Sequence, residues 1–374
     1  EQTMHACVWV DDVVISDNSP KLRDHFVGAL HNTFPLDDKG PLEWILGIQI
    51  KRDRRTRVLT MSQELYIQDV VAKHAAHLEG VSRHFDSPMS EDAHISYDQQ
   101  PPHGTPEWEN MRDKHDTYMI VVGALLYLSA CTRPDIAYAV SVLARFVSNP
   151  ALIHYQAMQR LLVYVRDSAH LVLVYKPNAS GFVAYSDASW DSKFSTSGGM
   201  FFLHNCLVAW YSRMQKSVSH SSAEAEFIGA SAAAREGMFH RDVLVDLDSL
   251  PTGPTTLYLD SKSAIDLCFD AVAFKKTKHI LRDAEFLRDV VARLTFAPKH
   301  VASADMLADI MTKPLPRPLF VRLRALLHLE DLREPNPSRR NMWRHAPQTA
   351  VTPGGADSLR AATLRVVALA TPQQ

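Results

Sequence analysis

Short runs of alternating hydrophobic and polar residues at the start of the chain are typical of β-strands. Residues 5–16 form an apolar run that is interrupted by Asp11 and Asp12. This pattern predicts a strand, a tight turn and a second strand. Residues 43–50 and 57–61 predict another hairpin. The first part of the chain is therefore expected to be mostly β.

Helical periodicity takes over in the next part of the chain. A helix is expected to begin at Ser62, and apolar residues recur with helical spacing over 117–131, 134–147 and 151–167. Between these helices, residues 84–108 carry several prolines among polar residues. That composition predicts a long loop or linker.

From about residue 181 strands and helices follow one another in a mixed order. We expect strands over 182–186, 200–204, 207–212, 256–259 and 294–297, and helices from Ser221, over 261–269, near 283–293 and over 304–312. Strands followed by alternating helices predict an α/β sheet with helices on its faces. The first of these strands is expected to end at Asp187.

The composition of the chain narrows the classes of function. Among 374 residues, Lys and Arg number 40 and Asp and Glu number 42, so the formal net charge is −2. A uniformly basic nucleic-acid-binding protein is therefore excluded, and any such affinity must come from local patches. The apolar run from Tyr118 to Cys131 is shorter than the roughly 20 residues of a membrane-spanning helix. No membrane partner is expected.

The cysteines and the N-terminus indicate the setting of the chain. None of the four cysteines lies in a C-x-x-C pair, so we expect neither a zinc site nor a disulfide framework. Free thiols are typical of a reducing intracellular compartment. Because the chain begins at Glu1, inside an expected strand and without a basic, apolar leader, we expect a fragment of a longer reading frame.

Four carboxylates in the part of the chain from about residue 181 occupy positions suited to binding metal ions. Asp187 ends the first expected strand, Glu226 lies in the first turns of the long helix, Asp260 follows the fourth strand, and Asp309 lies in the last helix. Together they would hold two Mg²⁺ ions about 4 Å apart for in-line hydrolysis of a phosphodiester. The cost of clustering like charges is offset only by metal, so the set indicates a site.

Each of these carboxylates also has an ordinary structural explanation. Asp187 could begin a turn, and Asp260 could cap the helix that follows it. Glu226 and Asp309 could be solvated helix positions. The case for a metal site therefore depends on the joint pattern.

Two assignments within the acidic set require a choice between neighbours. Ser221-x-x-Glu224 has the spacing of a capping box, which occupies Glu224 and leaves Glu226 as the free carboxylate. Asp305 lies near the start of the last expected helix, where a negative charge suits the helix dipole. We choose Asp309, one turn further on, as the metal-site carboxylate. Asp305 is kept as an alternative that would contact the metal ligands and not the metal itself.

The motifs, taken in order, resemble the polyproteins of Ty1/copia-type retrotransposons. The following motifs resemble the ribonuclease H domain of these polyproteins: YSDASW (185–190), STSGG (195–199), SSAEAEF (221–227), LYLDSKSA (257–264), KKTKHI (275–280) and ADMLADIMTKPLP (304–316). The downstream part of their reverse transcriptase is resembled by VWVDDVVISDN (8–18), LGIQI (46–50), MSQELYIQDVV (61–71), VGALLYLSACTRPDIAYAV (122–140) and ARFVSNP (144–150). The resemblance covers about residues 5–316.

The resemblance implies the organisation of the whole chain. It implies a partial palm and start of the thumb (1–83), a linker (84–108), a helical thumb or connection (109–176), a ribonuclease H-like domain (177–316) and a basic, flexible tail (317–374). The expected fold class is α/β and α+β. A partial reverse-transcriptase palm and thumb would precede a ribonuclease H-like mixed sheet flanked by helices.

The resemblance also implies an activity, hydrolysis of the RNA strand of RNA–DNA hybrids by a two-metal mechanism. Asp187, Glu226, Asp260 and Asp309 are the implied ligands of Mg²⁺ or Mn²⁺. His300 precedes Asp309 at a spacing similar to the mobile histidine of related enzymes, although a lone loop histidine is more often a bystander. By resemblance the chain would work in cytoplasmic virus-like particles or the nucleus.

Asp11 and Asp12 resemble the paired aspartates of a polymerase palm, although two acids in a hairpin turn are common. The family usually has Tyr before Val-Asp-Asp, whereas this chain has Trp9. A further metal-binding aspartate of the palm would lie upstream of Glu1. We therefore expect no polymerisation by this chain alone.

Basic and aromatic side chains offer local contacts for nucleic acid. Trp190, Trp210 and Tyr211 could stack on bases, although aromatic residues in strands are usually part of the core. Lys275, Lys276, Lys278 and His279 form a basic cluster whose motif favours phosphate contact. For the arginines of the tail, Arg317, Arg322 and Arg324, a solvated surface is the better interpretation. Arg133 could cap a helix or contact a phosphate, and the sequence does not decide.

Two other classes of function compete with the nuclease. A catalytically inactive retrotransposon remnant that folds and binds nucleic acid is favoured by the missing upstream palm and by altered motifs after Ile280. A serine hydrolase is a poor alternative, because the chain has no G-x-S-x-G motif. Oligomeric state is not readable from the sequence.

Overall fold

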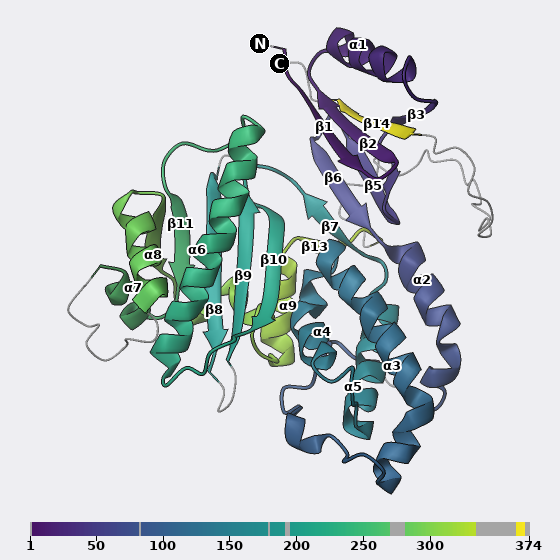
Figure 1. Ribbon diagram of the computed structural model, residues 1–374, viewed down its shortest axis with the longest axis vertical. Helices are drawn as coiled ribbons and strands as arrows, with labels where there is room; N and C mark the ends of the chain where they lie inside the picture. The colour runs from purple at the N-terminus through teal and green to yellow at the C-terminus, as the bar shows by residue number, and fades with distance from the viewer. Residues whose placement is uncertain are drawn as a thin grey trace. The chain divides into compact units, whose positions relative to one another are not determined.

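The computed structural model describes residues 2–81, 84–178, 180–190, 195–269, 281–333 and 364–370 (Figure 1). Contacts within the chain divide it into two compact units. One consists of residues 1–61 and 332–374, and the other of residues 62–331. Among the helices of the described ranges, none combines the length and apolar character that crossing a membrane requires.

The first unit is built on a sheet of strand order β1-β2-β14-β3. Besides these strands, β1 (Met4–Trp9), β2 (Asp12–Asp17), β14 (Leu364–Ala370) and β3 (Leu36–Pro41), this part of the chain contains α1 (Pro20–His31), β4 (Trp44–Ile45), β5 (Ile48–Asp53) and β6 (Val58–Ser62). Strands β1 and β2 pair antiparallel, as the sequence predicts for residues 5–16. Val13 and Ile15 are buried on one face of β2, because alternate residues of a strand point the same way. Phe26 of α1 packs against them.

The second unit begins with helices. They are α2 (Glu64–Lys73), η1 (Ala75–Leu78), η2 (Tyr97–Gln99), α3 (Pro106–Cys131), η3 (Pro134–Ile136), α4 (Ala137–Ala144) and α5 (Leu152–Asp167). Helix α3 starts inside the segment that was expected to be a linker. Thr105 Oγ1 accepts a hydrogen bond from Trp108 N at 3.3 Å, and Pro106 follows at the first helical position. Met89, in the same segment, is buried in the helical core, so this part of the segment is packed.

A five-stranded mixed sheet follows the helices and confirms the expected fold class. The rest of the second unit consists of β7 (Leu171–Tyr175), β8 (Phe182–Ser189), β9 (Thr196–Leu203), β10 (Cys206–Met214), α6 (Ser222–Asp246), β11 (Thr255–Leu259), α7 (Lys262–Phe269), α8 (Leu281–Ala292), β12 (Phe296–His300), η6 (Ser303–Asp305), η7 (Leu307–Met311), α9 (Arg317–Leu326) and β13 (Leu329–Asp331). The mixed sheet has the strand order β10-β9-β8-β11-β12, and β7 and β13 lie outside it. Strands β8, β9 and β10 are antiparallel, whereas β11 runs parallel to β8 and β12.

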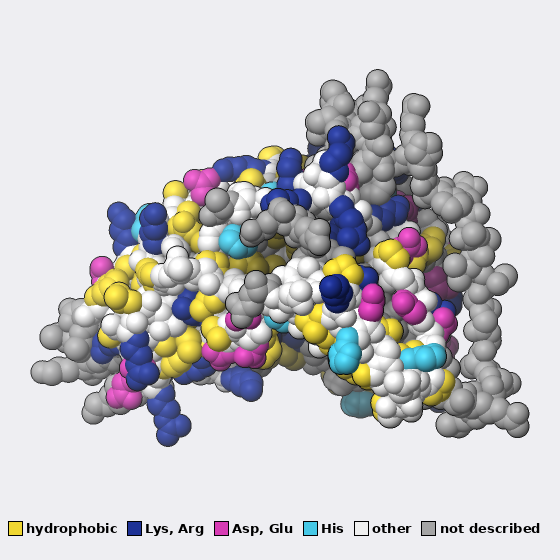
Figure 2. All heavy atoms as spheres, turned by 90° about the horizontal axis from the view of Figure 1, so that it is seen from above, with side chains coloured by type: hydrophobic (Ala, Val, Ile, Leu, Met, Phe, Trp, Pro, Cys, Tyr) yellow, Lys and Arg dark blue, Asp and Glu magenta, His cyan; other side chains and the backbone are white. Residues whose placement is uncertain are grey.

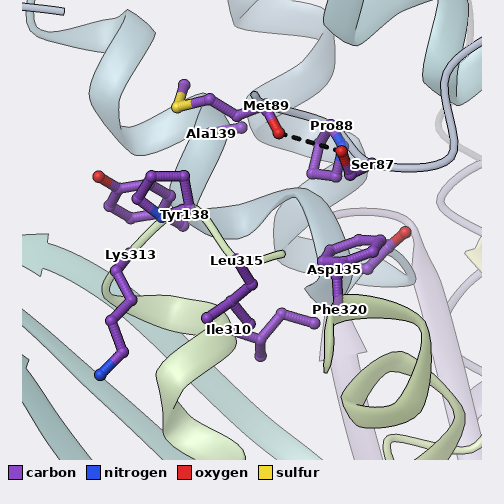
Figure 3. A pocket seen from close by; sticks show the side chains of 11 residues that line it. Ser87, Pro88, Met89, Asp135, Tyr138, Ala139, Ile310, Lys313, Leu315 and Phe320 are labelled. Atoms are coloured by element: carbon purple, nitrogen blue, oxygen red, sulfur yellow. Dashed lines mark hydrogen bonds between the residues drawn. The ribbon is translucent and has the colours of Figure 1, made fainter. Parts of the chain in front are cut away.

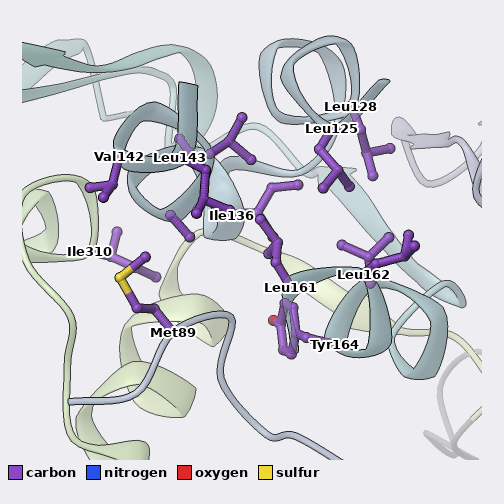
Figure 4. Packing of buried hydrophobic residues seen from close by; sticks show 14 of the residues in the cluster. Met89, Leu125, Leu128, Ile136, Val142, Leu143, Leu161, Leu162, Tyr164 and Ile310 are labelled. Atoms are coloured by element: carbon purple, nitrogen blue, oxygen red, sulfur yellow. The ribbon is translucent and has the colours of Figure 1, made fainter. Parts of the chain in front are cut away.

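Both faces of this sheet are covered. Phe201 of β9 packs with α6 residues such as Phe227 on one face. Its neighbours Met200 and Phe202 point to the opposite face, where they join one hydrophobic cluster with the helices α3 to α5 and with η7. Figure 4 shows Ile310 of η7 reaching into that cluster. The helices and the sheet of the second unit therefore share a core.

Three expectations at the level of single elements are corrected. Strand β8 continues past Asp187 to Ser189, because its pairing with β9 extends through Ser189. The helix expected over 304–312 is two short 3₁₀ turns, η6 and η7. The tail expected from residue 317 begins instead with the ordered elements α9 and β13.

The order of α9 and β13 has a clear physical cause. Helix α9 buries Phe320 and Leu323, an apolar stripe at helical spacing, in the core of the second unit. Strand β13 pairs antiparallel with β7. Burial of the stripe and the backbone pairing together fix residues 317–331.

Candidate active site

The first carboxylate of the site projects from the middle strand of the mixed sheet. Asp187 lies in β8, and its side chain is almost fully buried. In the antiparallel ladder it stands opposite Gly198 of β9. A Cβ atom at Gly198 would lie 2.6 Å from Met311 Cβ and 2.7 Å from Thr312 Cγ2. The glycine therefore allows η7 and the residues after it to approach the sheet beside Asp187.

The second carboxylate comes from the helix that crosses β8. Ser221 caps α6 by accepting a hydrogen bond from Glu224 N at 3.2 Å, and Glu224 accepts from His220 N at 3.1 Å. Glu224 is thus used at the helix start, as the capping-box interpretation predicts. Glu226, two residues further along the helix, accepts a hydrogen bond from Ala188 N at 3.2 Å. That contact joins the carboxylate to the residue after Asp187.

The third carboxylate follows β11 directly. Asp260 was a candidate cap for the next helix, but Ser261 Oγ performs that role by accepting from Ala264 N at 3.2 Å. Asp260 instead accepts a hydrogen bond from Ser303 Oγ at 3.1 Å. Because β8 and β11 are parallel neighbours, Asp187 and Asp260 emerge at the same edge of the sheet.

These three carboxylates converge on one point. One oxygen each from Asp187, Glu226 and Asp260 lie within 4.8 Å of one another. Hard carboxylate oxygens at this spacing are the ligands that Mg²⁺ prefers, with water completing its coordination. The residues present therefore fit a divalent metal ion.

The fourth predicted carboxylate, Asp309, lies beside this group and has a different partner. Lys313 Nζ is 2.8 Å from Asp309 Oδ1 and 3.6 Å from Asp187 Oδ2. Thr312 Oγ1 also donates to Asp187 Oδ2. The alternative, Asp305, pairs with Arg322 at 2.5 Å.

The electrostatics of the site follow from burial and from crowded negative charge. Burial raises the pKa of Glu226 to about 9, with further contributions from Asp187 and Asp260. Burial, followed by the charge of Asp187, raises the pKa of Asp309 to about 7. For Lys313, burial works against the ammonium, but the carboxylates of Asp187 and Asp309 outweigh it and raise its pKa. The site thus carries more acid than the protein neutralises.

The other predicted residues lie in three different places. His300 is exposed at the end of β12, opposite Leu259 and therefore next to the position of Asp260. Asp11 and Asp12 lie at the β1–β2 turn of the first unit. Preceding them, Val10 has a φ of 52°, which is rare for a β-branched residue. Lys275, Lys276, Lys278 and His279 lie outside the described residues.

Aromatic and basic residues weighed as contacts are also placed. Trp190 is 55% exposed just after β8, and its Nε1 donates to Ser219 O at 3.1 Å. Tyr211 is buried. Of the tail arginines, Arg317 pairs with Asp86 at 2.8 Å and Arg324 donates to Tyr164 Oη at 3.0 Å. These arginines therefore make intramolecular contacts.

The sequence interpretation missed three residues that shape the site. They are Gly198, Thr312 and Lys313. The i,i+4 spacing of Asp309 and Lys313 was a usable signal for the ion pair. Nothing in the sequence indicates that Thr312 and Lys313 would reach Asp187, which is 125 residues away along the chain from Thr312.

Lys313 also borders a cavity of about 10 Å³ between the helical segment and η7. Ser87, Met89, Tyr138 and Ile310 line it as well (Figure 3). Its volume suits at most one water molecule, so it is no substrate site. In Figure 3 the ammonium end of Lys313 is directed away from Ser87 and Met89.

Comparisons with known proteins match most of the chain. It is 34% identical over 322 residues to the retrovirus-related Pol polyprotein from transposon RE1 of Arabidopsis thaliana, across 85% of this chain and 21% of that protein. It is 31% identical over 329 residues to the corresponding polyprotein from transposon TNT 1-94 of Nicotiana tabacum, across 87% of this chain and 24% of that protein. The chain thus spans about a fifth to a quarter of the length of these relatives. No protein-family model matches.

Solved structures give weaker similarities. The N-terminal RNase H domain of a Mycobacterium tuberculosis protein aligns with 39% of this chain and 98% of its own length, at 15% identity and a TM-score of 0.27. A foamy viral protease–reverse transcriptase aligns with 57% of this chain and 35% of its own length, at 11% identity and a TM-score of 0.32.

Proposed function

Because the chain belongs to the family of Pol polyproteins from copia-type retrotransposons, we propose that residues 177–316 hydrolyse the RNA strand of RNA–DNA hybrids with a divalent metal ion. One observation carries the proposal. Asp187, Glu226 and Asp260 come from three separate elements, yet their oxygens lie within 4.8 Å of one another. Such crowding is costly in a scaffold and useful in a metal site.

Each carboxylate is held by a neighbour that fixes its direction. Thr312 Oγ1 donates to Asp187, Ala188 N donates to Glu226, and Ser303 Oγ donates to Asp260. A bound Mg²⁺ or Mn²⁺ would supply the positive charge that brings a phosphodiester and an attacking water together. The carboxylates would fix the position of the metal ion and thereby of the phosphodiester. Cleavage would leave a 5′-phosphate and a 3′-hydroxyl.

The substrate class follows from the family and from local surface features. The net charge of −2 gives no general attraction for polyanions. In Figure 2, Lys and Arg side chains are interspersed with acidic and hydrophobic ones. Binding therefore depends on local contacts, for which exposed Trp190 beside β8 is one candidate. A contact with the RNA 2′-hydroxyl would distinguish RNA from DNA.

We also propose a role for the β1–β2 turn in the polymerase activity of proteins of this family. Asp11 and Asp12 would be metal ligands of that polymerase, in agreement with the motif VWVDDVV at 8–14. The strained Val10 directly before them supports a functional turn, since strain of this kind collects at functional sites.

The test is cleavage of a labelled RNA–DNA hybrid by the purified full chain. Metal-dependent cutting of the RNA strand, lost with EDTA and in Asp187→Asn, would support the proposal. The matched control is Asp289→Asn, which alters an exposed carboxylate of α8 that pairs with Arg293. A folded chain that binds hybrid and leaves both strands intact would favour the inactive-remnant alternative.

A further inference from the structure

The acidic site contains a cation of its own. Lys313 Nζ lies 2.8 Å from Asp309 Oδ1 and 3.6 Å from Asp187 Oδ2, and so bridges carboxylates from η7 and β8. The side chains of Asp187 and Asp309 are 2% and 8% exposed, whereas that of Lys313 is 39% exposed. The ammonium therefore lies beside two buried acids, on a side chain that is partly exposed to solvent.

This pair differs from an ordinary surface ion pair. Lys73 and Asp69 of α2 have the same i,i+4 spacing at 2.6 Å, but their side chains are 67% and 54% exposed. Such an exposed pair has little effect on its surroundings. Lys313 contacts two buried carboxylates, and its backbone N also donates to Asp309 O at 3.3 Å.

The remaining contacts divide the four acids into two sets. Lys313 Nζ and Thr312 Oγ1 both contact the same oxygen of Asp187, Oδ2. Among the described residues, the group of converging carboxylates contains Asp187, Glu226 and Asp260 but not Asp309. One set can therefore take a divalent ion while the other already holds an ammonium.

The geometry points to Lys313 as a built-in counter-cation that stands where a second divalent ion would otherwise bind. The free protein then takes one divalent ion, at Asp187, Glu226 and Asp260. Lys313 keeps Asp309 out of the ligand set until the ammonium is displaced. This makes Lys313 a positioning residue, and the inference rests on the proposed function because it concerns the same metal site.

The test counts bound Mn²⁺ on the full chain without substrate, by electron paramagnetic resonance of free Mn²⁺ and by calorimetry. We expect one tightly bound ion in the wild type, one in Lys73→Met and two in Lys313→Met. The affinity for the second ion should rise about tenfold or more in Lys313→Met, since the competing positive charge is gone. Two tight ions in the wild type, or identical binding in wild type and Lys313→Met, would overturn the inference.

Asp309→Asn gives a second measurement that does not depend on the folding of Lys313→Met. Because Asp309 is occupied by Lys313, this change should leave the single-ion affinity within about twofold of the wild type. A tenfold loss would make Asp309 a ligand in the free protein and overturn the inference.

Hybrid cleavage by the same preparations separates the two proposals. One bound ion without cleavage contradicts the proposed function and supports the role of Lys313. Two bound ions in the wild type together with cleavage contradict only the inference about Lys313 and leave the proposed function supported. Thermal melting of each variant confirms that the protein counted is folded.

Discussion

Two clusters of buried charge among the described residues of the second unit are neutralised to very different extents. In the first, Arg133 donates to both carboxylate oxygens of Asp135 at 2.9 and 2.8 Å and to Ser168 O at 3.2 Å. Tyr164 Oη donates to Asp135 at 2.5 Å. The second cluster, at the candidate active site, has three converging carboxylates and one nearby lysine.

The pKa shifts express this difference. Burial alone would raise the pKa of Asp135, but the charge and hydrogen bonds of Arg133 reverse this and lower it. At Glu226 the neighbours are acids, so burial and charge both raise the pKa, to about 9. A buried charge that is paired with an opposite charge of the same chain has a structural role. A buried charge without such a partner needs a bound cation or a proton to balance it.

The largest effect is expected from breaking the active-site cluster. Asp187→Asn should lower hybrid cleavage about a thousandfold or more, because it removes a ligand that contributes several kcal/mol to metal-assisted chemistry. Its melting temperature in EDTA should stay equal to or above that of the wild type, since one of the repelling charges is gone. Near-normal cleavage by this variant would contradict the site assignment.

Breaking the compensated cluster should act on stability instead. Arg133→Met should lower the free energy of unfolding by about 3–5 kcal/mol, because Asp135 is left buried without its cation. Urea denaturation measures the loss. Arg293→Met, which breaks an exposed pair with Asp289, is the control and should cost less than about 1 kcal/mol. Equal losses in the two variants would mean that burial of the Arg133 pair carries no weight.

A smaller effect is expected at the glycine that lets η7 approach Asp187. Gly198→Ala should cost about 1–3 kcal/mol through overpacking against Met311 and Thr312. It should also weaken Mn²⁺ binding, because Thr312 holds Asp187. Gly123→Ala in α3, where a Cβ meets nothing within 4 Å, should be neutral or stabilising by up to about 1 kcal/mol. A stable, metal-binding Gly198→Ala protein would contradict the close approach.

The smallest effect per step of the measurement is a slope of stability with pH, which for one titrating group is at most about 1.4 kcal/mol per pH unit. The pKa of Glu226 rises from 4.5 to about 9 on folding, so the folded state binds more protons than the unfolded state between these values. Stability of the metal-free protein should therefore fall as pH rises through that window. Melting temperatures in EDTA measure the slope, and Glu226→Gln should flatten it. The lowered pKa of Asp135 acts in the opposite direction, with stability lost only in acid.

Much of the architecture could be predicted because it depends on local patterns. The β1–β2 hairpin, the β9–β10 hairpin turning at His204 and Asn205, and the cap of α6 at Ser221 all follow from short-range signals. The start of α3 was misplaced although Thr105 and Pro106 are typical of a helix start. Prolines nearby favoured the linker interpretation, and burial of the segment decided against it.

Within the candidate site, the sequence by itself determined the set of candidate carboxylates, and the capping box provided a physical reason to prefer Glu226 over Glu224. Only the tertiary structure decided which of these carboxylates converge and which one pairs with Lys313. Gly198 brings η7 onto β8, and this contact places Thr312 and Lys313 against Asp187. The same holds for Arg133, which donates to Ser168 and lies over the ring of Tyr164, two residues from another helix and its end. Local patterns fix helices, turns and caps, but the neutralisation of a buried charge depends on residues that only folding brings together.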